Sequence, residues 1–286
     1  MKLQRFFRSA LSTALRTLVL LLVALSLKPA VQAQVQTPAQ PKYALLEYMK
    51  IEPGKAAEYR KMEQEVWLPV HRERIKGKLI SGWAMYGVRY PGGTAREYDV
   101  VVVTTFDNFK DVEANIPPEI FAKANPNLKR EEYNARAAAV RKMVRTEVIA
   151  LVDSAWPGSE DPRAAATAAP AKYVRVDYKR IEAGKNADYA ANERKYYKPL
   201  WQAAVDQGAM RGWAVWGVRF PGGTDKEYGF VTVQFFDKFE QLDGNPSRGL
   251  WEKVHPNVKS ADIYGQMGAL SKTVRSEVLT LLERAQ

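Results

Sequence analysis

Charged side chains that recur along strand-like segments are the first candidates for chemistry. Carboxylates and guanidinium groups occupy these positions: Glu47, Asp177, Arg89, Arg219, Arg145, Glu147, Arg275 and Glu277. If the segments form one sheet, a carboxylate beside an arginine on its polar face could orient an acidic or carbonyl-bearing ligand. Burial there would raise the pKa of a carboxyl such as Glu47 into the range of a general base. Alternatively, the charges only pair across neighbouring strands and fix how two sheets dock.

Aromatic residues form a second set, and they suit either a pocket for a flat apolar ligand or a hydrophobic core. They are Trp83, Tyr86, Tyr90, Tyr98, Trp213, Trp216, Phe220 and Tyr228. Trp83 shares its predicted strand face with Arg89, so we expect this face, rather than that of Tyr86, to meet an inter-sheet cavity. The predicted ligand-binding residues are Trp83, Arg89, Arg145, Trp213, Arg219 and Arg275.

His71 is the second catalytic candidate beside Glu47. It lies four residues after Trp67, so the two side chains point the same way on a helix. A histidine at the mouth of a pocket can work as a general base. The alternative is a surface or capping histidine. His255 precedes Pro256 and is predicted to lie in a turn.

Several site classes are excluded or unsupported. The chain has no cysteine, which excludes disulfides, thiolate catalysis and cysteine-ligated metals. Two scattered histidines without a ligand-like spacing predict no metal site, and we expect no bound cofactor. Gly92-Gly93 lie between two predicted strands rather than before a helix, so they indicate a turn and not a phosphate loop.

The secondary-structure elements that must position these residues occur twice in the sequence. Residues 43–152 align with residues 173–282 at a constant offset of 130 positions and without a gap. The clearest block is GWAMYGVRYPGGTAREY at 82–98 against GWAVWGVRFPGGTDKEY at 212–228. Such self-similarity indicates a tandem duplication.

Each copy has the same pattern of predicted elements. A strand over 43–51 is followed by a helix whose apolar stripe includes Tyr59 and Val70, and which Pro69 must kink or end. A hairpin follows over 83–89 and 98–106. A Pro-broken stretch, a helix over 128–143 and a strand over 145–152 complete the copy.

This order predicts an α+β fold in which two tandem ferredoxin-like βαββαβ repeats pack their antiparallel sheets together as an intramolecular barrel. The predicted domains are a signal peptide over 1–33, repeat 1 over 42–152, a Pro/Ala-rich linker over 153–171 and repeat 2 over 172–283. Repeat 1 is expected to pack on repeat 2, and the sequence sets no further oligomeric state.

The first 33 residues resemble a secretory signal. Basic residues precede an apolar run over 17–27, which is too short for a membrane span of about 20 residues, and small residues follow near Ala33. We therefore predict cleavage near Ala33, a periplasmic or secreted protein, and no stable membrane insertion afterwards; an uncleaved anchor is the alternative. Removing this segment lowers the net charge from +11 to +6, without a basic block that would predict nucleic-acid binding.

Each copy resembles the dimeric α+β barrel superfamily, and in particular NIPSNAP and antibiotic-biosynthesis-monooxygenase-like domains. The opening strand, Pro53-Gly54-Lys55, the Tyr-bearing helix and the hairpin from Gly82-Trp83 to Phe106-Asp107 carry the resemblance. The resemblance implies that the protein is a cofactor-free oxygenase, a haem-degrading enzyme, an isomerase or a domain without activity. The His, Trp and Asn of haem-degrading members do not map onto this sequence.

Three functions are compatible with the sequence. The first is a binding protein that encloses a small aromatic or acidic molecule in a barrel or sheet–helix pocket. The second is a cofactor-independent monooxygenase-like enzyme that works through Glu47 or His71. The third is a structural or partner-binding module without a ligand.

Overall fold

The computed structural model describes residues 41–158, 171–223 and 226–285. The predicted signal peptide over 1–33 and most of the predicted linker lie outside these residues. We refer to residues 41–158 as the first half and to residues 171–285 as the second half.

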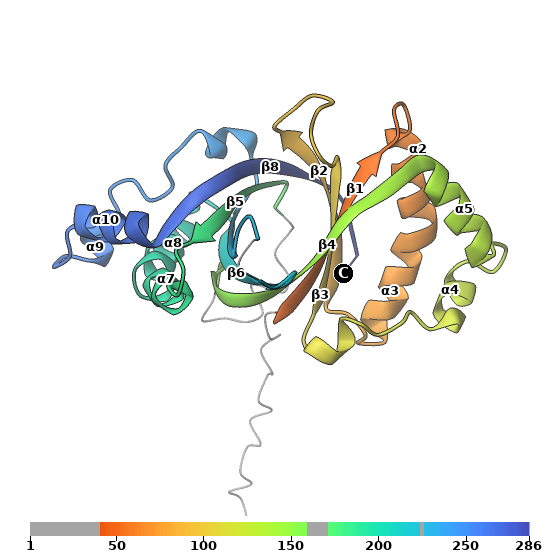
Figure 1. The fold of residues 1–286 in the computed structure, drawn as a ribbon, viewed down its shortest axis with the longest axis horizontal. Coiled ribbons are helices and arrows are strands. Elements are labelled where there is room, and N and C mark those ends of the chain that lie inside the picture. The colour runs from red at the N-terminus through yellow and green to blue at the C-terminus, as the bar shows by residue number, and fades with distance from the viewer. Residues whose placement is uncertain (1–40, 159–170, 224–225, 286) are drawn as a thin grey trace, which may run out of the picture. The chain divides into compact units, whose positions relative to one another are not determined.

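Eight antiparallel strands close a barrel in the order β1-β3-β2-β8-β5-β7-β6-β4. The strands are β1 (Tyr43–Ile51), β2 (Gly82–Tyr90), β3 (Val100–Phe106), β4 (Arg141–Ala155), β5 (Tyr173–Ile181), β6 (Gly212–Phe220), β7 (Phe230–Phe236) and β8 (Ser271–Ala285). The α+β class and the antiparallel sheet predicted from the sequence are confirmed. Figure 1 shows that the helices lie outside this barrel.

The two halves meet through their longest strands. β4 pairs with β6 from Val148 to Ala155, and β8 pairs with β2 from Val278 to Ala285. Each of these strands also pairs with the first strand of its own half. Hydrogen-bonded strands therefore run continuously around both halves and leave no open sheet edge between them.

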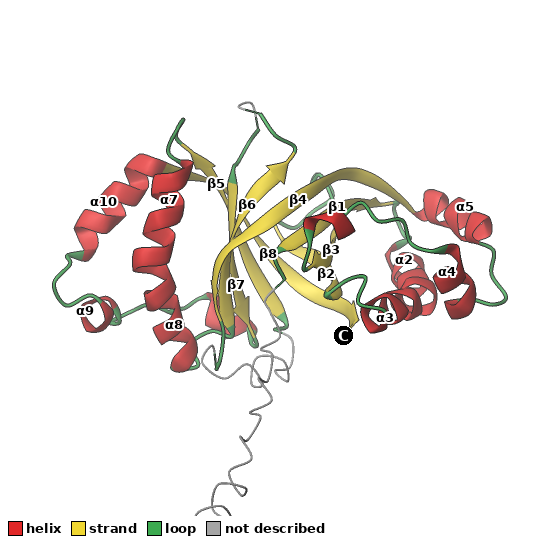
Figure 2. Cartoon of the chain, turned by 90° about the horizontal axis from the view of Figure 1, so that it is seen from below, coloured by secondary structure: helices red, strands yellow, loops and turns green. Residues whose placement is uncertain are grey.

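The helices follow the first and third strands of each half. They are α2 (Ala56–Met62), α3 (Leu68–Lys76), α4 (Pro118–Ala124), α5 (Arg130–Val140), α7 (Asn186–Asn192), α8 (Lys198–Asp206), α9 (Trp251–Val254) and α10 (Ser260–Leu270). Short 3₁₀ turns span Phe109–Asp111 and Phe239–Leu242. In Figure 2 the helices of each half cover the outer side of that half's strands.

Pro69 does not end its helix as the sequence suggested. A π-helical turn over Glu63–Trp67 separates α2 from α3, and Pro69 lies in the first turn of α3. The helix runs on through this turn, because the amide of Leu68, the first residue of α3, donates to the carbonyl of Glu63 five residues earlier. Pro199 has the same position after the π-helical turn Glu193–Tyr197.

The last helix and strand of the first half differ in length from the prediction. α5 ends at Val140, and β4 then begins at Arg141 because that residue pairs with Ile51 of β1. β4 continues to Ala155 because its far end pairs with β6. Residues 153–155, which the sequence assigned to the linker, therefore belong to a strand.

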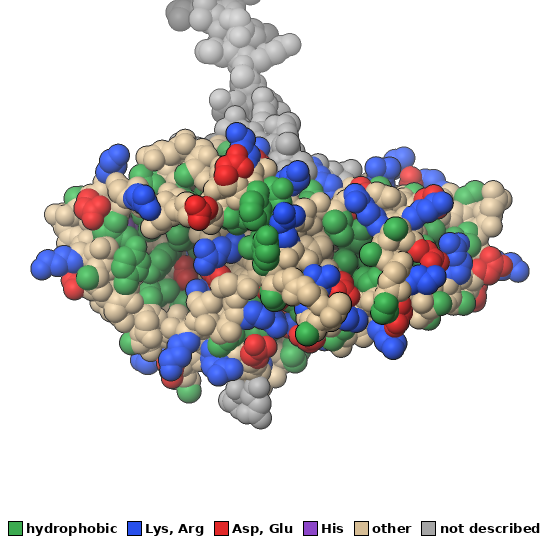
Figure 3. Space-filling view, turned by 90° about the horizontal axis from the view of Figure 1, so that it is seen from above, with side chains coloured by type: hydrophobic (Ala, Val, Ile, Leu, Met, Phe, Trp, Pro, Cys, Tyr) green, Lys and Arg blue, Asp and Glu red, His purple; other side chains and the backbone are tan. Residues whose placement is uncertain are grey.

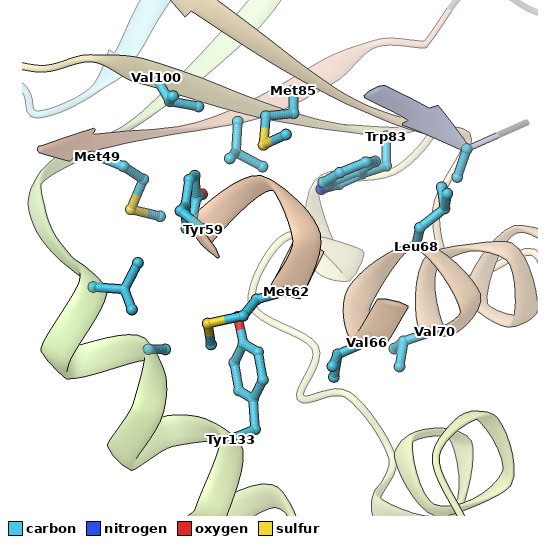
Figure 4. Packing of buried hydrophobic residues seen from close by; sticks show 14 of the residues in the cluster. Met49, Tyr59, Met62, Val66, Leu68, Val70, Trp83, Met85, Val100 and Tyr133 are labelled. Carbon is cyan, nitrogen blue, oxygen red and sulfur yellow. The ribbon is translucent and has the colours of Figure 1, made fainter. Parts of the chain in front are cut away.

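Buried apolar side chains form three clusters. One lies between the helices and strands of the first half and contains Tyr59, Trp83 and Tyr133 (Figure 4). Its equivalent in the second half contains Tyr189 and Trp213. The third lies inside the barrel and draws residues from both halves. A ligand site can thus lie inside the barrel or under the helices.

Candidate functional site

The barrel contains a partly open cavity of about 310 Å³ that is lined by residues of all eight strands. Alternate residues of β1 face it, namely Ala44, Leu46 and Tyr48. The corresponding positions of β5 supply Val174, Val176 and Tyr178. The remaining apolar wall includes Val101, Val103, Ile149, Trp216, Val231, Val233, Phe235 and Leu279. Such a wall excludes water and favours an apolar ligand.

Polar side chains also line the cavity, namely Ser81, Thr105, Tyr48, Tyr178 and one phenol–cation pair, Tyr86 on β2 and Arg284 on β8. Burial raises the pKa of Tyr86 to about 12, an effect that the Arg284 cation partly offsets. Burial also lowers the pKa of Arg284, and the guanidinium has no ion-pair partner among the residues that the structure describes. The pair therefore offers a phenol donor and a cation to a ligand oxygen.

This polar pair has no equivalent across the barrel. The residue 130 positions after Tyr86 is Trp216, and the residue 130 positions before Arg284 is Ser154. The cavity is therefore chemically asymmetric, although its apolar wall is built from corresponding residues of the two halves. An asymmetric cavity can bind a ligand in one orientation.

A buried polar cluster borders one end of the cavity, and we call it the tyrosine–glutamate cluster. Its members are Tyr48, Tyr98, Glu147, Tyr178, Tyr228 and Glu277. Tyr48 donates a hydrogen bond of 2.9 Å to Glu147, which also accepts one from Tyr228. Glu277 accepts hydrogen bonds from Tyr178 at 3.0 Å and from Tyr98 at 2.7 Å. Tyr48 and Tyr178 also line the cavity, so they connect the cavity to the cluster.

Two arginines complete the cluster. Nε of Arg145 lies 3.2 Å from Glu147, and its guanidinium carbon lies 4.0 Å from the ring centre of Tyr48. Arg275 lies likewise 3.4 Å from Glu277 and 4.3 Å from the ring centre of Tyr178. Both arginines also pair with Glu97. Burial alone would lower the pKa of Arg145, but the hydrogen bond to Glu97 and the neighbouring phenols and Glu147 raise it instead.

The bonding of Glu147 and Glu277 limits what they can do. Each carboxylate accepts hydrogen bonds from two phenols and pairs with one arginine. Burial is the main reason that the pKa of Tyr48 and that of Tyr178 lie well above the usual value, so both phenols remain donors. The cluster thus stabilises buried charge and joins the halves, and it offers no unoccupied carboxylate as a base.

A second polar group lies under the helices of the first half, around His71. The imidazole stacks on Trp83 at 4.6 Å and on Trp67 at 5.6 Å between ring centres. Nη1 of Arg74 lies 3.1 Å from Nδ1 of His71. Because arginine can only donate, Nδ1 is the acceptor and the imidazole hydrogen lies on Nε2. This geometry leaves His71 no lone pair with which to accept a proton.

Two carboxyls lie in the same region. Burial raises the pKa of Glu47, and the cations Arg141 and Arg74 counteract part of this rise. Burial also raises the pKa of Glu63 to about 7, although Arg141 and a 3.2 Å hydrogen bond from Tyr133 favour its charged form. Glu63 is only 4% exposed. It can therefore hold a proton near neutral pH, but it lies in packed surroundings and lines none of the pockets described here.

The structure separates the predicted site residues into three places. Arg145 and Arg275 lie at the cavity end of the barrel. Glu47, His71 and Trp83 lie under the first-half helices, and Trp213 packs under those of the second half. Arg89 and Arg219 are exposed at the ends of β2 and β6.

The residues predicted on one face of β2 have different surroundings. Trp83 lines the cavity together with Tyr86, and its side chain also packs in the cluster under the helices, whereas Arg89 is exposed. Glu47 also lies on the helix side of β1, where Arg74 and Arg141 compensate its charge. The physical reason is that the apolar residues of β1 point into the barrel, whereas the alternate residues point toward the helices. There, Arg74 of α3 and Arg141 of β4 lie near Glu47.

Sequence reasoning missed several residues of the cavity. Tyr48 and Tyr178 were not among the predicted ligand-binding residues, although they occupy corresponding positions of the two copies and alternate in step with Ala44 and Val174. Arg284 lies just after the predicted end of repeat 2 at residue 283. Its signal was its departure from the repeat, since a serine occupies the corresponding position.

Two further properties concern the described residues only. In the parts of the chain that the structure covers, no three His, Cys, Asp or Glu side chains come close enough together to hold a metal ion. Among the same residues, no helix has the length and apolar character that crossing a bilayer requires.

Comparisons with known proteins support the fold. No family model matches the sequence, and no curated protein is significantly similar to it. A crystal structure from Lactobacillus acidophilus NCFM, named a "putative monooxygenase", matches with a TM-score of 0.51 and 9% identity over 87% of this chain and 97% of that one. Another protein of that name, from Fusobacterium nucleatum subsp. nucleatum, matches with a TM-score of 0.51 and 8% identity over 87% and 96% of the two chains. Such low identity shows the fold alone: this chain shares the α+β fold of these two proteins over most of its length.

Proposed function

We propose that the barrel cavity binds one small, flat, mainly apolar molecule that carries an acidic oxygen. The observation that carries this proposal is the mainly apolar cavity of about 310 Å³, in which Arg284, beside the Tyr86 phenol, is the one charged lining residue among those that the structure describes. An engineered apolar cavity of ~150 Å³ is large enough for benzene. A cavity of about twice that size suits a molecule of two or three fused rings.

The polar pair indicates which functional group the ligand carries. A carboxylate, phenolate or enolate near Arg284 and Tyr86 would receive a charge-assisted hydrogen bond in apolar surroundings, where such bonds are strong. The aromatic side chains Trp216 and Phe235 would contact the ring system. The ligand class is therefore an aromatic acid or an acidic fused-ring ketone.

A second candidate function is oxygenation of the same molecule without a bound cofactor. The names of the two structural neighbours favour it, because both are called monooxygenases. An acidic ring methylene between aromatic rings would lose a proton and react with O₂. One oxygen atom would become the new carbonyl and the other would leave as water with the two methylene hydrogens, so no external reductant is required. Arg284 would stabilise the intermediate enolate oxygen.

Binding is tested with 2-naphthoate and its neutral analogue naphthalene-2-carboxamide. Trp216 lines the cavity, so tryptophan fluorescence and thermal unfolding report on occupancy. We expect 2-naphthoate to quench fluorescence and raise the Tm, and the amide to bind about tenfold more weakly, which corresponds to about 1.4 kcal/mol. Arg284→Gln should remove this preference, whereas Ser154→Ala, at the corresponding position of the other half, should retain it.

A cavity-filling variant decides whether the barrel is the site. Val103 lines the cavity, and Val103→Phe places a ring in it. We expect this variant to fold and to lose 2-naphthoate binding. If it binds as well as the parent does, the ligand lies elsewhere and the proposal fails. Oxygenation is tested separately with anthrone. Uptake of one O₂ per ketone formed supports it, whereas binding of anthrone without O₂ uptake contradicts oxygenation and supports binding as the function.

We also propose that the two halves arose by tandem duplication of a ferredoxin-like, NIPSNAP-like unit. The ungapped sequence alignment and the same order of strands and helices in both halves support this. Limited proteolysis between residues 159 and 170 followed by gel filtration tests whether the halves hold together once the covalent link is cut. Separation into stable monomers would contradict intramolecular barrel formation.

Export to the periplasm or the exterior is a further proposal, and the basic and apolar pattern of residues 1–33 supports it. Mass spectrometry of the protein recovered from cell fractions tests it. We expect a chain that begins near residue 34 in the exported fraction. A full-length chain confined to the cytoplasm would contradict it.

A further inference from the structure

The two halves differ at the residue that directly precedes the second strand of the hairpin. This residue is Asp99 in the first half and Gly229 in the second. Their backbones make the same hydrogen bonds. The Asp99 amide donates to Met49 at 2.8 Å, and the Gly229 amide donates to Lys179 at 2.9 Å. The two positions are therefore structurally equivalent, and only the side chain differs.

In the first half, the Asp99 carboxylate is held by three groups. Oδ2 accepts a hydrogen bond of 2.8 Å from the Ile51 amide, and Oδ1 accepts one of 2.6 Å from Nε of Arg96. Nζ of Lys50 lies 3.6 Å from Oδ1. Burial alone would raise the pKa of Asp99, but these donors and cations hold it below its usual value. The three groups thus form a cradle for an ionised carboxylate.

In the second half the cradle lacks its carboxylate. Arg180, Ile181 and Lys226 occupy the positions of Lys50, Ile51 and Arg96. Arg180 donates to the carbonyl of Glu227 at 2.9 Å, and Lys226 lies 3.5 Å from that of Val218. Within residues 171–223 and 226–285, neither cation forms an ion pair with an acidic side chain of the described chain.

A pocket opens at this point. Its volume is about 460 Å³, and it is lined by Arg180, Ile181, Glu182, Ala183, Gly184, Asn186, Gly223, Lys226, Tyr228 and Gly229. The one carboxylate among these lining residues, Glu182, lies 3.9 Å from Lys272. A Cβ placed on Gly229 would lie 3.8 Å from Nζ of Lys226 and 3.8 Å from a side-chain carbon of Ile181. The space beside the cation is thus large enough for the atoms that Asp99 supplies in the first half.

We infer that this pocket binds a small carboxylate, which takes the place that the Asp99 side chain fills in the first half. One carboxylate oxygen accepts from the Ile181 amide, and the other faces Lys226 and Arg180. A flat anion with two oxygens matches this division, whereas a spherical anion such as chloride satisfies only one side. The remainder of the ligand extends into the pocket toward Gly184 and Asn186.

The two halves provide matched variants for the test. Gly229→Asp supplies the carboxylate within the chain. Its new Cβ makes contacts of 3.6 Å and longer, and Gly229 lies outside the left-handed backbone region that disfavours side chains, so the variant is expected to fold. Asp99→Gly removes the built-in carboxylate from the first half and should create a second site.

The measurement is a titration of the ¹⁵N-labelled full chain with sodium acetate at constant ionic strength, with sodium chloride as the comparison. We expect the Ile181 amide resonance to move in a saturable manner with acetate and to stay in place with chloride. Gly229→Asp should reduce the acetate-dependent movement at least about tenfold. In Asp99→Gly, the Ile51 amide should also begin to respond.

Three results would overturn the inference. One is an Ile181 response that is equal for acetate and chloride, because it would show binding of any anion rather than recognition of a carboxylate. Another is an unchanged acetate response in folded Gly229→Asp, because it would place the anion elsewhere. The third is the absence of any acetate response in the parent. If Asp99→Gly does not fold, the comparison of the parent with Gly229→Asp still decides the question.

Discussion

The phenol oxygen of Tyr98 lies 2.7 and 2.6 Å from the two carboxylate oxygens of Glu277, a residue of the other half of the chain, and its single O–H donates to this carboxylate. The relationship is reciprocal, because Tyr228 of the second half donates to Glu147 of the first. Each half thus supplies part of the hydrogen bonding that the other half's buried carboxylate requires. The halves are joined by buried polar bonds as well as by strand pairing.

Removing one of these phenols should weaken the folded state. Tyr98→Phe leaves Glu277 with Tyr178 and Arg275 but removes a hydrogen bond to a buried charge. Such bonds contribute about 1.5–3 kcal/mol, and we expect the free energy of unfolding to fall by that amount. Chemical denaturation measures it. Tyr90→Phe, at a site that is 49% exposed, is the control and should change stability little. Equal stability of the two variants would contradict the role of Tyr98.

Glu63 should make stability depend on pH. Its pKa is about 7 in the folded chain because of burial, and near 4.5 when unperturbed. Between these values the folded state keeps a proton that the unfolded chain releases, so stability falls as the pH rises from about 4.5 to 7 and stays reduced above 7. A shift of this size corresponds to at most roughly 3 kcal/mol.

The test for Glu63 is a comparison of variants at two pH values. Glu63→Gln should raise the free energy of unfolding by about 1–3 kcal/mol at pH 8 and have a smaller effect at pH 5. Glu65→Gln, on the exposed side of the same π-helical turn, should change neither value. A gain for Glu63→Gln that is equal at both pH values would show that ionisation is not the cause.

His71 should remain neutral over the physiological range. Its pKa falls to about 3, mainly because the imidazole is buried and to a smaller extent because the Arg74 cation lies nearby. The stability linked to neutral His71 is complete above the unfolded value near 6.5 and is lost as the pH falls toward 3. In NMR spectra, we expect the imidazole resonances of His71 to be constant between pH 5 and 8. Titration of His71 within that range would instead indicate an open, hydrated site.

A fourth prediction compares a buried and an exposed residue on one face of β2. Trp83→Ala removes a side chain that is 3% exposed and stacked on His71, so it should cost about 3–5 kcal/mol of stability. Arg89→Ala, six residues later on the same strand face, should change stability by less than about 0.5 kcal/mol, because Arg89 is exposed. Thermal and chemical denaturation measure both. A large loss in Arg89→Ala would contradict the exposed position of this residue.

The strand pattern was predictable because it depends on local properties. Alternation set the first strand at Tyr43–Ile51, and paired glycines marked the hairpin turn at residues 92–93. The boundaries that failed depend on distant partners. Arg141 belongs to β4 because it pairs with Ile51 of β1. Ala155 belongs to β4 because it pairs with Trp213 of β6.

The candidate site was less predictable for the same reason. Alternation showed which residues share a face but not which face turns inward. Tyr86 and Arg284 are almost 200 positions apart and approach each other only because β2 and β8 pair across the halves. The departure of Arg284 from the repeat was visible in the sequence, but its position in a cavity was not.

The sequence by itself determined the repeated order of elements, the strand faces and the chemical asymmetries between the halves, because these follow from residue types and their spacing. Only the tertiary structure decided that the apolar faces line a cavity, that Nδ1 of His71 accepts a hydrogen bond from Arg74, and that Gly229 leaves a cradle without its carboxylate. Those outcomes depend on contacts between residues far apart in the chain, which exist only when the barrel has closed.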